Sequence, residues 1–478
     1  MKKMLFSLTL VLLILSSMLA SCVNNPPEVS SVESAEASEA ESTFELKKKD
    51  MEGDEIIFLV PDNTYAYYES FEIYAEELNN EVINDAVFNR NATVEDYYKC
   101  SILAEKSSAI SDKIRTNVDS GITYYDVYMP MMNDAVSVAA DGYLYDLNSL
   151  ENLNLKNAYW DQAANESLEL AGKLYMTTGD ISTLDNDCTM VMFFNKRLVS
   201  DNGMESPYDM VKDNKWTLDN VYEMSREFTS DNGDSKWNNE DKYGLHVAFN
   251  ATHSFFFGCG GRTTTNEDGT IQLVMDSEAN VTILNNVFDV AFADDVVTNK
   301  TAGCATFETI CEMFTNKQII FTTFALIDIK QFRYAKDFEF GILPYPLADE
   351  NQEDYICFVS TGLVPAICFP KNADKLDNAT LAVEAMAYYS TDTLTKAYYE
   401  QTLMYRDLQD NDSEEMLDII FKSRAYDMGF IYGWGGIRSI IQTLNDRTSR
   451  DFVSAFGAIK SAVLADIEST LEEYASDK

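Results

Sequence analysis

Few residues of this sequence stand in the patterns with which enzymes usually do chemistry. No GxSxG, HExxH or Walker motif occurs in its 478 residues. His246 and His253 are seven residues apart, a spacing that suits no common metal pair on a helix. The glycine-rich stretch at 258–261 is followed by Arg262, so it lacks the last glycine of a GxGxxG loop. Glycoside hydrolysis needs only two carboxylates, and 79 acidic residues leave that reaction open.

A polar stretch at 230–241 has oxygen-bearing side chains spaced as in a calcium-binding EF-hand loop. The matching positions are Asn232, Asp234, Asn238 and Asp241. Ser230 stands where such a loop has aspartate, and Ser235 stands where it has glycine. The stretch is therefore either a degenerate calcium loop or a polar turn between a helix and a strand, and these departures favour the turn. Apart from this possible calcium ion, the sequence predicts no cofactor.

The first residues have the composition of a targeting segment. Lys2 and Lys3 precede an apolar run at 4–15, which ends in the small residues before Cys22. We expect residues 1–21 to be a signal peptide. Leu19–Cys22 resembles a lipobox, which predicts a lipidated Cys22, although an ordinary cleavage site is the alternative. Residues 22–48, rich in Ser, Glu and Ala, then read as a disordered tether.

The body of the chain is strongly acidic and holds unpaired cysteines. The net charge of −43 argues against nucleic-acid binding and against direct docking on an anionic membrane, so a lipid anchor is the one membrane contact we expect. Seven cysteines remain besides Cys22 and cannot all pair within the chain. We interpret them as buried thiols that pack as small hydrophobic side chains.

The order of apolar segments indicates an α/β fold. A buried strand at 56–60, helices at 65–84 and 104–118, and a strand at 125–130 predict a parallel sheet. A helix should begin at Thr217, which can cap it, with Trp216 packing on Val221. Further strands are expected at 189–195, 319–324, 338–343 and 363–369, and an amphipathic helix at 452–471.

Several short motifs, in this order and spacing, are similar to those of bacterial extracellular solute-binding proteins of the sugar-binding type, which serve ABC importers. The similarity covers nearly the whole chain after the signal peptide. The motifs are Tyr125-Asp126-Val127-Tyr128, Gly142 to Leu147, Tyr159-Trp160-Asp161, Gly172 to Tyr175 with Gly179-Asp180, Met192 to Lys196, Trp216 to Asp219, Lys242 to Leu245, Phe340 to Pro346 and Tyr432 to Gly436.

The resemblance implies a fold of the periplasmic-binding-protein-like type II: two α/β lobes joined by a hinge, with a ligand cleft between them. It places the first lobe at 49–184 plus 327–361 and the second at 185–326 plus 362–478. It also implies extracellular capture of a sugar or another small polar solute, and delivery to an ABC transporter permease by a monomer at the outer face of the membrane. A receptor-linked sensor and, less favoured, a secreted glycoside hydrolase are the alternatives; we do not expect an enzyme.

Sugar sites combine aromatic faces with a few polar groups. Asp180 is the first polar candidate, because it stands just before an expected lobe crossing. Trp434 is the first aromatic candidate, because the flanking glycines let a backbone approach closely, with core packing as its alternative. Tyr128 ends a strand, where α/β sheets bind ligands. Three further aromatic residues match cleft positions loosely: Trp160, Phe257 and Phe324. For the two phenylalanines, packing in the core is the favoured interpretation.

Overall fold

The computed structural model describes residues 46–62, 69–248, 251–267, 270–298, 300–332, 335–403 and 410–475. The expected signal peptide, Cys22 and nearly all of the expected tether lie outside these residues. Among the described residues, no helix combines the length and apolar character that crossing a membrane requires.

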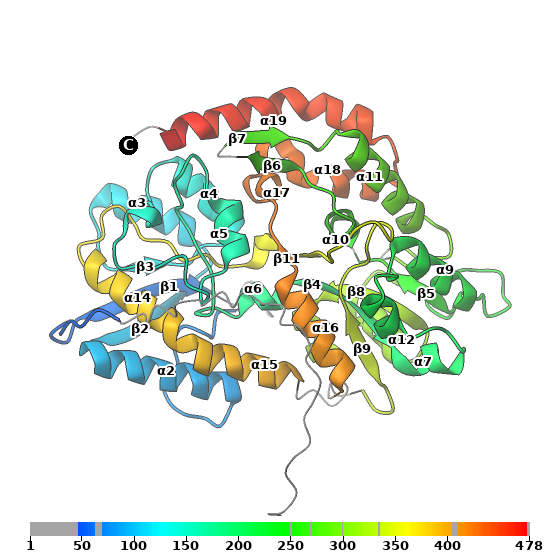
Figure 1. Ribbon diagram of the computed structural model, residues 1–478, viewed down its shortest axis with the longest axis horizontal. Coiled ribbons are helices and arrows are strands. Elements are labelled where there is room, and N and C mark those ends of the chain that lie inside the picture. The colour runs from blue at the N-terminus through cyan, green and yellow to red at the C-terminus, as the bar shows by residue number, and fades with distance from the viewer. Residues whose placement is uncertain are drawn as a thin grey trace, which may run out of the picture. The chain divides into compact units, whose positions relative to one another are not determined.

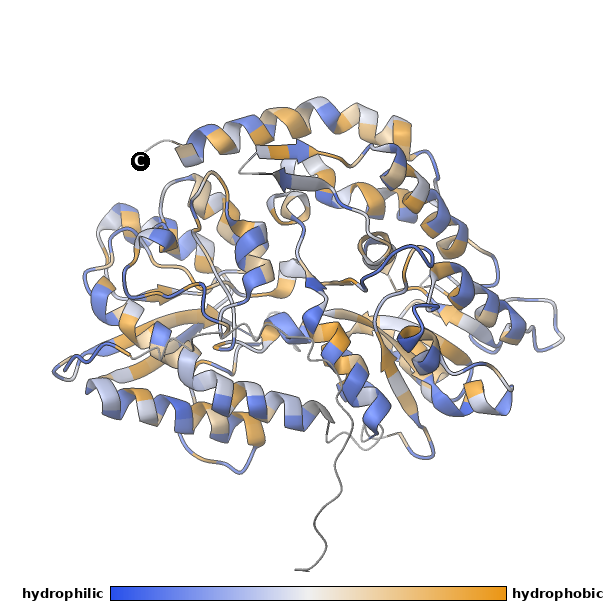
Figure 2. Ribbon diagram, in the orientation of Figure 1, coloured by the Kyte–Doolittle hydropathy of each residue, from blue (hydrophilic) through white to orange (hydrophobic). Residues whose placement is uncertain are grey.

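The first half of the chain builds a parallel three-stranded sheet in the order β2-β1-β3. Its strands are β1 (Glu55–Pro61), β2 (Ser101–Ser107) and β3 (Val127–Tyr128). Figure 1 shows α3 (Ile110–Ser120) and α4 (Met132–Ala140) on one side of this sheet and α2 (Val82–Tyr98) on the other. A parallel sheet with helices on both faces is buried on both sides, and β1 is correspondingly apolar (Figure 2).

A second, four-stranded sheet has the order β5-β8-β4-β9. Its strands are β4 (Met190–Asn195), β5 (Tyr243–His246), β8 (Ile319–Ala325) and β9 (Phe340–Leu343). β4 runs antiparallel to both of its neighbours, β8 and β9. As a result β5, β8 and β9 all end at the edge where β4 begins. The helices between them are α7 (Lys196–Asp201), α8 (Pro207–Lys212), α9 (Leu218–Phe228), α10 (Ala251–Gly258), α11 (Glu278–Ala291) and α12 (Phe307–Thr315).

The remaining elements connect or cover these two sheets. Along the chain, the elements between β3 and β4 are η1 (Leu147–Ser149), α5 (Gln162–Leu168) and α6 (Leu184–Asp187). β6 (Thr264–Glu267) pairs with β7 (Thr270–Leu273), and β10 (Cys357–Phe358) pairs with β11 (Arg424–Ala425). The other segments are η2 (Leu326–Asp328), α13 (Ile329–Phe332), η3 (Thr361–Leu363), α14 (Leu376–Ser390), η4 (Thr391–Thr395), α15 (Lys396–Leu403), α16 (Asn411–Lys422), α17 (Met428–Tyr432), η6 (Trp434–Ser439), α18 (Ile440–Arg447) and α19 (Phe452–Ala475).

The two lobes are present, but the chain divides between them differently from the expected boundaries. β9 lies within 327–361, which we assigned to the first lobe, yet it pairs with β4 of the second sheet. Conversely, Ile367 and Cys368 bridge to Thr177 and Tyr128 of the first lobe, and α14 packs on α2 and β1. Pairing between distant strands decides where the chain crosses, and the local sequence pattern carries no signal of that pairing.

Two expected helices are also corrected. Residues 101–107 form β2, since they pair along their whole length with β1, although the sequence suggested a helix over 104–118. The described part of the expected helix at 65–84 is irregular up to Glu81, and α2 begins at Val82. The carbonyl groups of Glu72 and Ile73 accept hydrogen bonds from Arg90 and Asn91 rather than from a following helical turn.

Other expectations are confirmed. Thr217 caps α9, its hydroxyl accepting the Asn220 amide hydrogen bond at 3.3 Å. Trp216 is buried and donates to the Pro344 carbonyl at 3.1 Å. All seven cysteines in the described residues are free thiols, and only Cys311 is partly exposed. The strand expected at 363–369 is wrong, because this apolar stretch makes single bridges rather than a continuous ladder.

Candidate functional site

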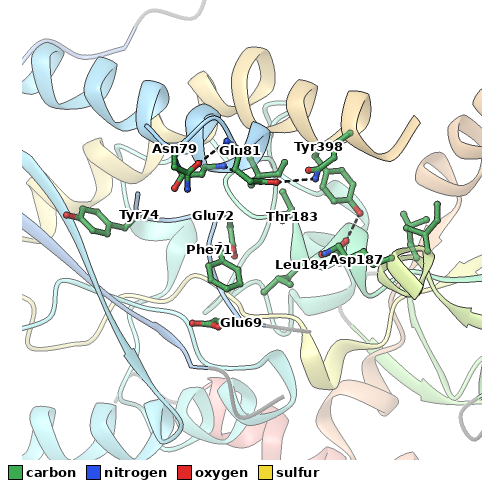
Figure 3. A pocket seen from close by; sticks show the side chains of 16 residues that line it. Glu69, Phe71, Glu72, Tyr74, Asn79, Glu81, Thr183, Leu184, Asp187 and Tyr398 are labelled. Carbon is green, nitrogen blue, oxygen red and sulfur yellow. Dashed lines mark hydrogen bonds and ion pairs between the residues drawn. The ribbon is translucent and has the colours of Figure 1, made fainter. Parts of the chain in front are cut away.

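A cavity of about 480 Å³ lies among residues 69–84, α6, α15 and the segment that directly follows β8. Ligands of open α/β sheets bind outside the carboxyl ends of the strands, and Leu326, the first residue after β8, belongs to the lining. Figure 3 shows its lining. The lining residues come from the segment after β1, from α6, from the segment after β8 and from α15: Glu69, Phe71, Glu72, Tyr74, Asn79, Glu81, Ile83, Asn84, Thr183, Leu184, Asp187, Leu326, Ile329, Lys330, Tyr398 and Gln401.

Two aromatic side chains of this lining are open to solvent. The exposed fraction is 59% for Phe71 and 38% for Tyr74. The ammonium group of Lys106 lies 4.5 Å from the centroid of the Phe71 ring and forms an ion pair with Glu69. The apolar faces of such rings suit the C–H patches of a sugar.

Asp187 supplies a carboxylate to the same cavity. It is buried, and the Tyr398 hydroxyl donates to its Oδ1 at 2.7 Å (Figure 3). The Lys330 ammonium lies 3.8 Å from Oδ2. Burial raises the pKa of Asp187 above its usual range, while Lys330 and Tyr398 act against that shift. A carboxylate with one oxygen already held in place can accept a solute hydroxyl without first being ordered.

Glu72 lies deeper in the wall of the cavity. The Ser182 hydroxyl donates to its carboxylate at 3.1 Å, and burial raises its pKa. This contact connects the segment after β1 to the first crossing between the lobes. The lining therefore joins residues that are far apart in sequence but meet at the hinge.

Two of the residues predicted from the sequence lie together in a second cavity. This cavity, of about 550 Å³, is lined by Asp180 and Trp160 and shares Tyr398 with the first. Trp160 is 1% exposed, and its indole donates to Glu384 at 3.1 Å. Asp180 accepts a hydrogen bond from the Thr391 hydroxyl at 2.7 Å, and burial raises its pKa.

Arg424 dominates the charge of the second cavity. Its guanidinium lies 2.9 Å from Asp161 and 3.3 Å from Asp185, and it also bonds to Asn186. The Tyr426 hydroxyl donates at 2.8 Å to the same Asp161 oxygen, Oδ2, that Arg424 contacts. Burial raises the pKa of Asp185, and Arg424 opposes the shift. The carboxylates here are thus already engaged with protein donors.

Trp434 lies apart from both cavities. It is 4% exposed, stacks on Tyr432 and donates to the Thr470 hydroxyl of α19 at 2.9 Å. A Cβ added at Gly435 would stand 2.3 Å from the Val463 nitrogen, so the close backbone approach that the glycines permit is made to α19. This geometry supports the packing interpretation, and ligand contact by Trp434 stays a prediction.

The three remaining aromatic candidates are packed inside the protein. Phe257 stacks on Phe358 with ring centroids 4.4 Å apart. Phe324 is 6% exposed and contacts His246 and Phe307. The Tyr128 hydroxyl accepts a hydrogen bond from Asn117 at 2.9 Å, and the side chain is 1% exposed. None of them lines either cavity.

The calcium-like loop is ordered by its own backbone. Both oxygens of Asp241 accept amide hydrogen bonds, from Asn232 at 2.8 Å and from Asn238 at 2.7 Å. The side chains of Asn232, Asp234 and Asn238 each accept from the amide two residues later. Among the described residues, no group of three or more His, Cys, Asp or Glu side chains is placed to hold a metal. Calcium binding stays a prediction.

Sequence reasoning missed Phe71, Tyr74 and Asp187. We expected a helix at 65–84, and none of its residues was among the predicted site residues. Phe71 and Tyr74 stand 10 and 13 residues after Pro61, where β1 ends, so the local pattern carried no signal that they line a cavity.

These observations define a class of protein: a two-lobed α/β protein whose hinge region carries a cavity with exposed aromatic and acidic side chains. Residues 80–392 match the profile of the family described as bacterial extracellular solute-binding protein. Because this match covers more than half of the chain, the chain belongs to that family. No curated protein matches the chain in sequence.

Solved structures with the same fold agree. A cyclo/maltodextrin-binding protein complexed with maltotetraose is 14% identical, with a TM-score of 0.56 over 89% of this chain and 98% of that one. UspC of M. tuberculosis is 12% identical, with a TM-score of 0.56 over 86% and 100%. An ABC substrate-binding protein from Listeria monocytogenes in complex with cycloalternan is 14% identical, with a TM-score of 0.51 over 88% and 99%. The likeness confirms the expected type II periplasmic-binding-protein fold.

Proposed function

We propose that this solute-binding protein captures a carbohydrate in the cavity that Phe71, Tyr74 and Asp187 line. The observation that carries the proposal is the exposure of Phe71 and Tyr74 beside the carboxylate of Asp187. Rings cover the apolar faces of a sugar while a carboxylate accepts its hydroxyl hydrogen bonds. The acidic lining disfavours anionic solutes, because Lys330 is the one basic residue among the described residues that line the cavity.

The ligands of the structural relatives support a sugar as the solute. Maltotetraose and cycloalternan, bound in two of them, are both oligosaccharides. Since family members of this class deliver solutes to ABC importers, we propose the same partner here. We also propose that the protein acts as a monomer outside the cell, held by the lipidated Cys22 through its tether.

A binding screen tests the proposal. Thermal shift across neutral mono- and oligosaccharides should find a ligand that raises the melting temperature, because a ligand that binds only the folded state stabilises it. The oligosaccharide should be recovered intact after long incubation, which separates binding from hydrolysis. A melting temperature that no carbohydrate changes, or release of shorter sugars, would contradict the proposal.

Calorimetry on single variants then locates the ligand. Tyr74→Ala should weaken binding about tenfold, since it removes an aromatic face from the solute. Tyr124→Ala is the matched control, because Tyr124 is 53% exposed and lies outside the cavity. Equal affinity of wild type, Tyr74→Ala and Phe71→Ala would move the ligand elsewhere.

The anchor has its own test. Cys22→Ser should release the mature protein from the membrane fraction into the medium, because acylation needs the thiol. Membrane retention of this variant would contradict lipidation.

A further inference from the structure

Arg90 is a buried cation that contacts the wall of the proposed site. It stands on α2 and is 0% exposed. Its guanidinium makes six hydrogen bonds to described residues, and every acceptor is a neutral oxygen. Burying an arginine without a carboxylate acceptor costs free energy. If the side chain only filled space, an apolar residue would stabilise the fold more.

The acceptors belong to three segments that meet at the hinge. One guanidinium nitrogen donates to the carbonyls of Glu72 at 2.7 Å and Ile73 at 3.2 Å, between Phe71 and Tyr74. The other terminal nitrogen donates to the Ile181 carbonyl at 3.4 Å, just before α6, and to the Ser390 hydroxyl at 3.2 Å, at the end of α14. Ile181 stands at the first passage from the first lobe to the second, whereas the elements after Ser390, η4 and α15, still pack on α2 in the first lobe.

The neighbouring Asn91 completes this arrangement. Its side-chain oxygen accepts from Arg90 at 2.9 Å, and its amide donates to the Ile73 carbonyl at 2.9 Å. Burial lowers the pKa of Arg90 to about 9, while the nearby Glu72 carboxylate opposes the shift, so the side chain stays protonated at neutral pH. Only a planar fork with several donors can reach these three segments at once; a lysine ammonium cannot.

We infer that Arg90 is a positioning residue, which fixes the segment carrying Phe71 and Tyr74 to the first passage between the lobes, at Ile181, and to the end of α14, at Ser390. The inference rests on the proposed function for its effect on binding. Phe71 and Tyr74 flank the two carbonyls that Arg90 holds. Their positions therefore depend on the contacts of Arg90 rather than on the conformational preference of the segment itself. Movement of the lobes would then move the aromatic wall of the site with it.

Hydrogen exchange of the full mature chain tests the inference directly. In Arg90→Lys, peptides covering 69–81 should exchange about tenfold faster than in wild type, because several charge-assisted hydrogen bonds are lost. Val94→Ala is the control: Val94 is buried on the same helix, and its truncation lowers stability without touching the segment. Unchanged exchange at 69–81 in Arg90→Lys would overturn the inference.

Affinity provides the second measurement. For the sugar found by the screen, Arg90→Lys should bind about tenfold more weakly, while Val94→Ala should bind as wild type at a similar loss of melting temperature. Should Arg90→Lys fail to fold, Ser390→Ala removes one acceptor and keeps the arginine, and it should give a smaller increase in exchange at 69–81. If wild type binds no carbohydrate, the proposed function fails, and exchange at 69–81 still decides the role of Arg90.

Discussion

Two cavities that share Tyr398 contain the same kinds of residues but differ in whether their aromatic rings are exposed. Both are lined by aromatic rings and carboxylates, and both lie beside segments that cross between the lobes. In the first, Phe71 and Tyr74 are exposed. In the second, Trp160 is buried, and Arg424 pairs with Asp161 and Asp185.

The difference teaches that residue type alone does not identify a binding site. A ring contributes to binding only if its face is open, and a carboxylate only if its acceptor positions are free. The second cavity holds the residues that look most like a sugar site in the sequence, but its Trp160 ring is buried. Asp187 and Asp180 each already accept a hydrogen bond from a protein hydroxyl, so the rings rather than the carboxylates distinguish the two cavities. We therefore interpret the first cavity as the binding site and the second as part of the hinge.

The largest expected effect is loss of the hinge ion pairs. Arg424→Met should lower the free energy of unfolding by about 3–5 kcal/mol, because it leaves Asp161 and Asp185 buried without a cation. The loss should be smaller at pH 5 than at pH 8, since burial raises the pKa of Asp185 to about 7 and its protonation at the lower pH relieves the unpaired charge. Urea unfolding at both pH values measures it.

Arg450→Met is the matched control. Arg450 pairs with Asp289 at the surface, where the two side chains are 50% and 65% exposed, so its loss should cost less than about 1 kcal/mol. Equal costs for the two variants would contradict the hinge assignment of Arg424.

A smaller effect on stability is expected at Trp160. Trp160→Phe keeps an aromatic ring but leaves Glu384 without the indole donor, at a cost of about 1–3 kcal/mol. Affinity for the solute should be unchanged if Trp160 serves the hinge. Calorimetry on the folded variant measures this, and a loss of affinity without a loss of stability would return Trp160 to the ligand site.

The two aspartates give the most direct comparison of the cavities. Asp187→Asn should weaken solute binding about fivefold to tenfold, because a charged acceptor becomes a neutral one. Asp180 remains the competing prediction of the sequence, so Asp180→Asn should be measured alongside it. A larger loss in Asp180→Asn would exchange the assignments of the two cavities.

The smallest effect is a dependence on pH with opposite signs for binding and stability. Burial raises the pKa of Asp187 in the folded protein. Between its ordinary and its raised pKa, only the folded state holds the proton, so its contribution to the free energy of unfolding falls as pH rises. Affinity should rise over the same window, since the carboxylate is the better acceptor. Calorimetry and melting across this window should show both trends weakened in Asp187→Asn.

Local pattern determined much of this protein. The buried strands, the Thr217 cap, the amphipathic C-terminal helix and the free buried cysteines follow from apolar runs, spacing and composition, which act over a few residues. The order of short motifs was sufficient to predict the two-lobed fold and the family, because that order is shared along most of the chain.

Only the tertiary structure decided where the site is. Phe71 is more than 250 residues from Lys330 and Tyr398 in the sequence, and the three meet because the chain crosses the hinge more than once. The irregular segment after β1 exists because Arg90 and Asn91 take the carbonyls that a helix would use. Whether Trp160 or Tyr74 presents an open ring depends on what packs against it, and packing between distant segments leaves no trace in a local sequence pattern.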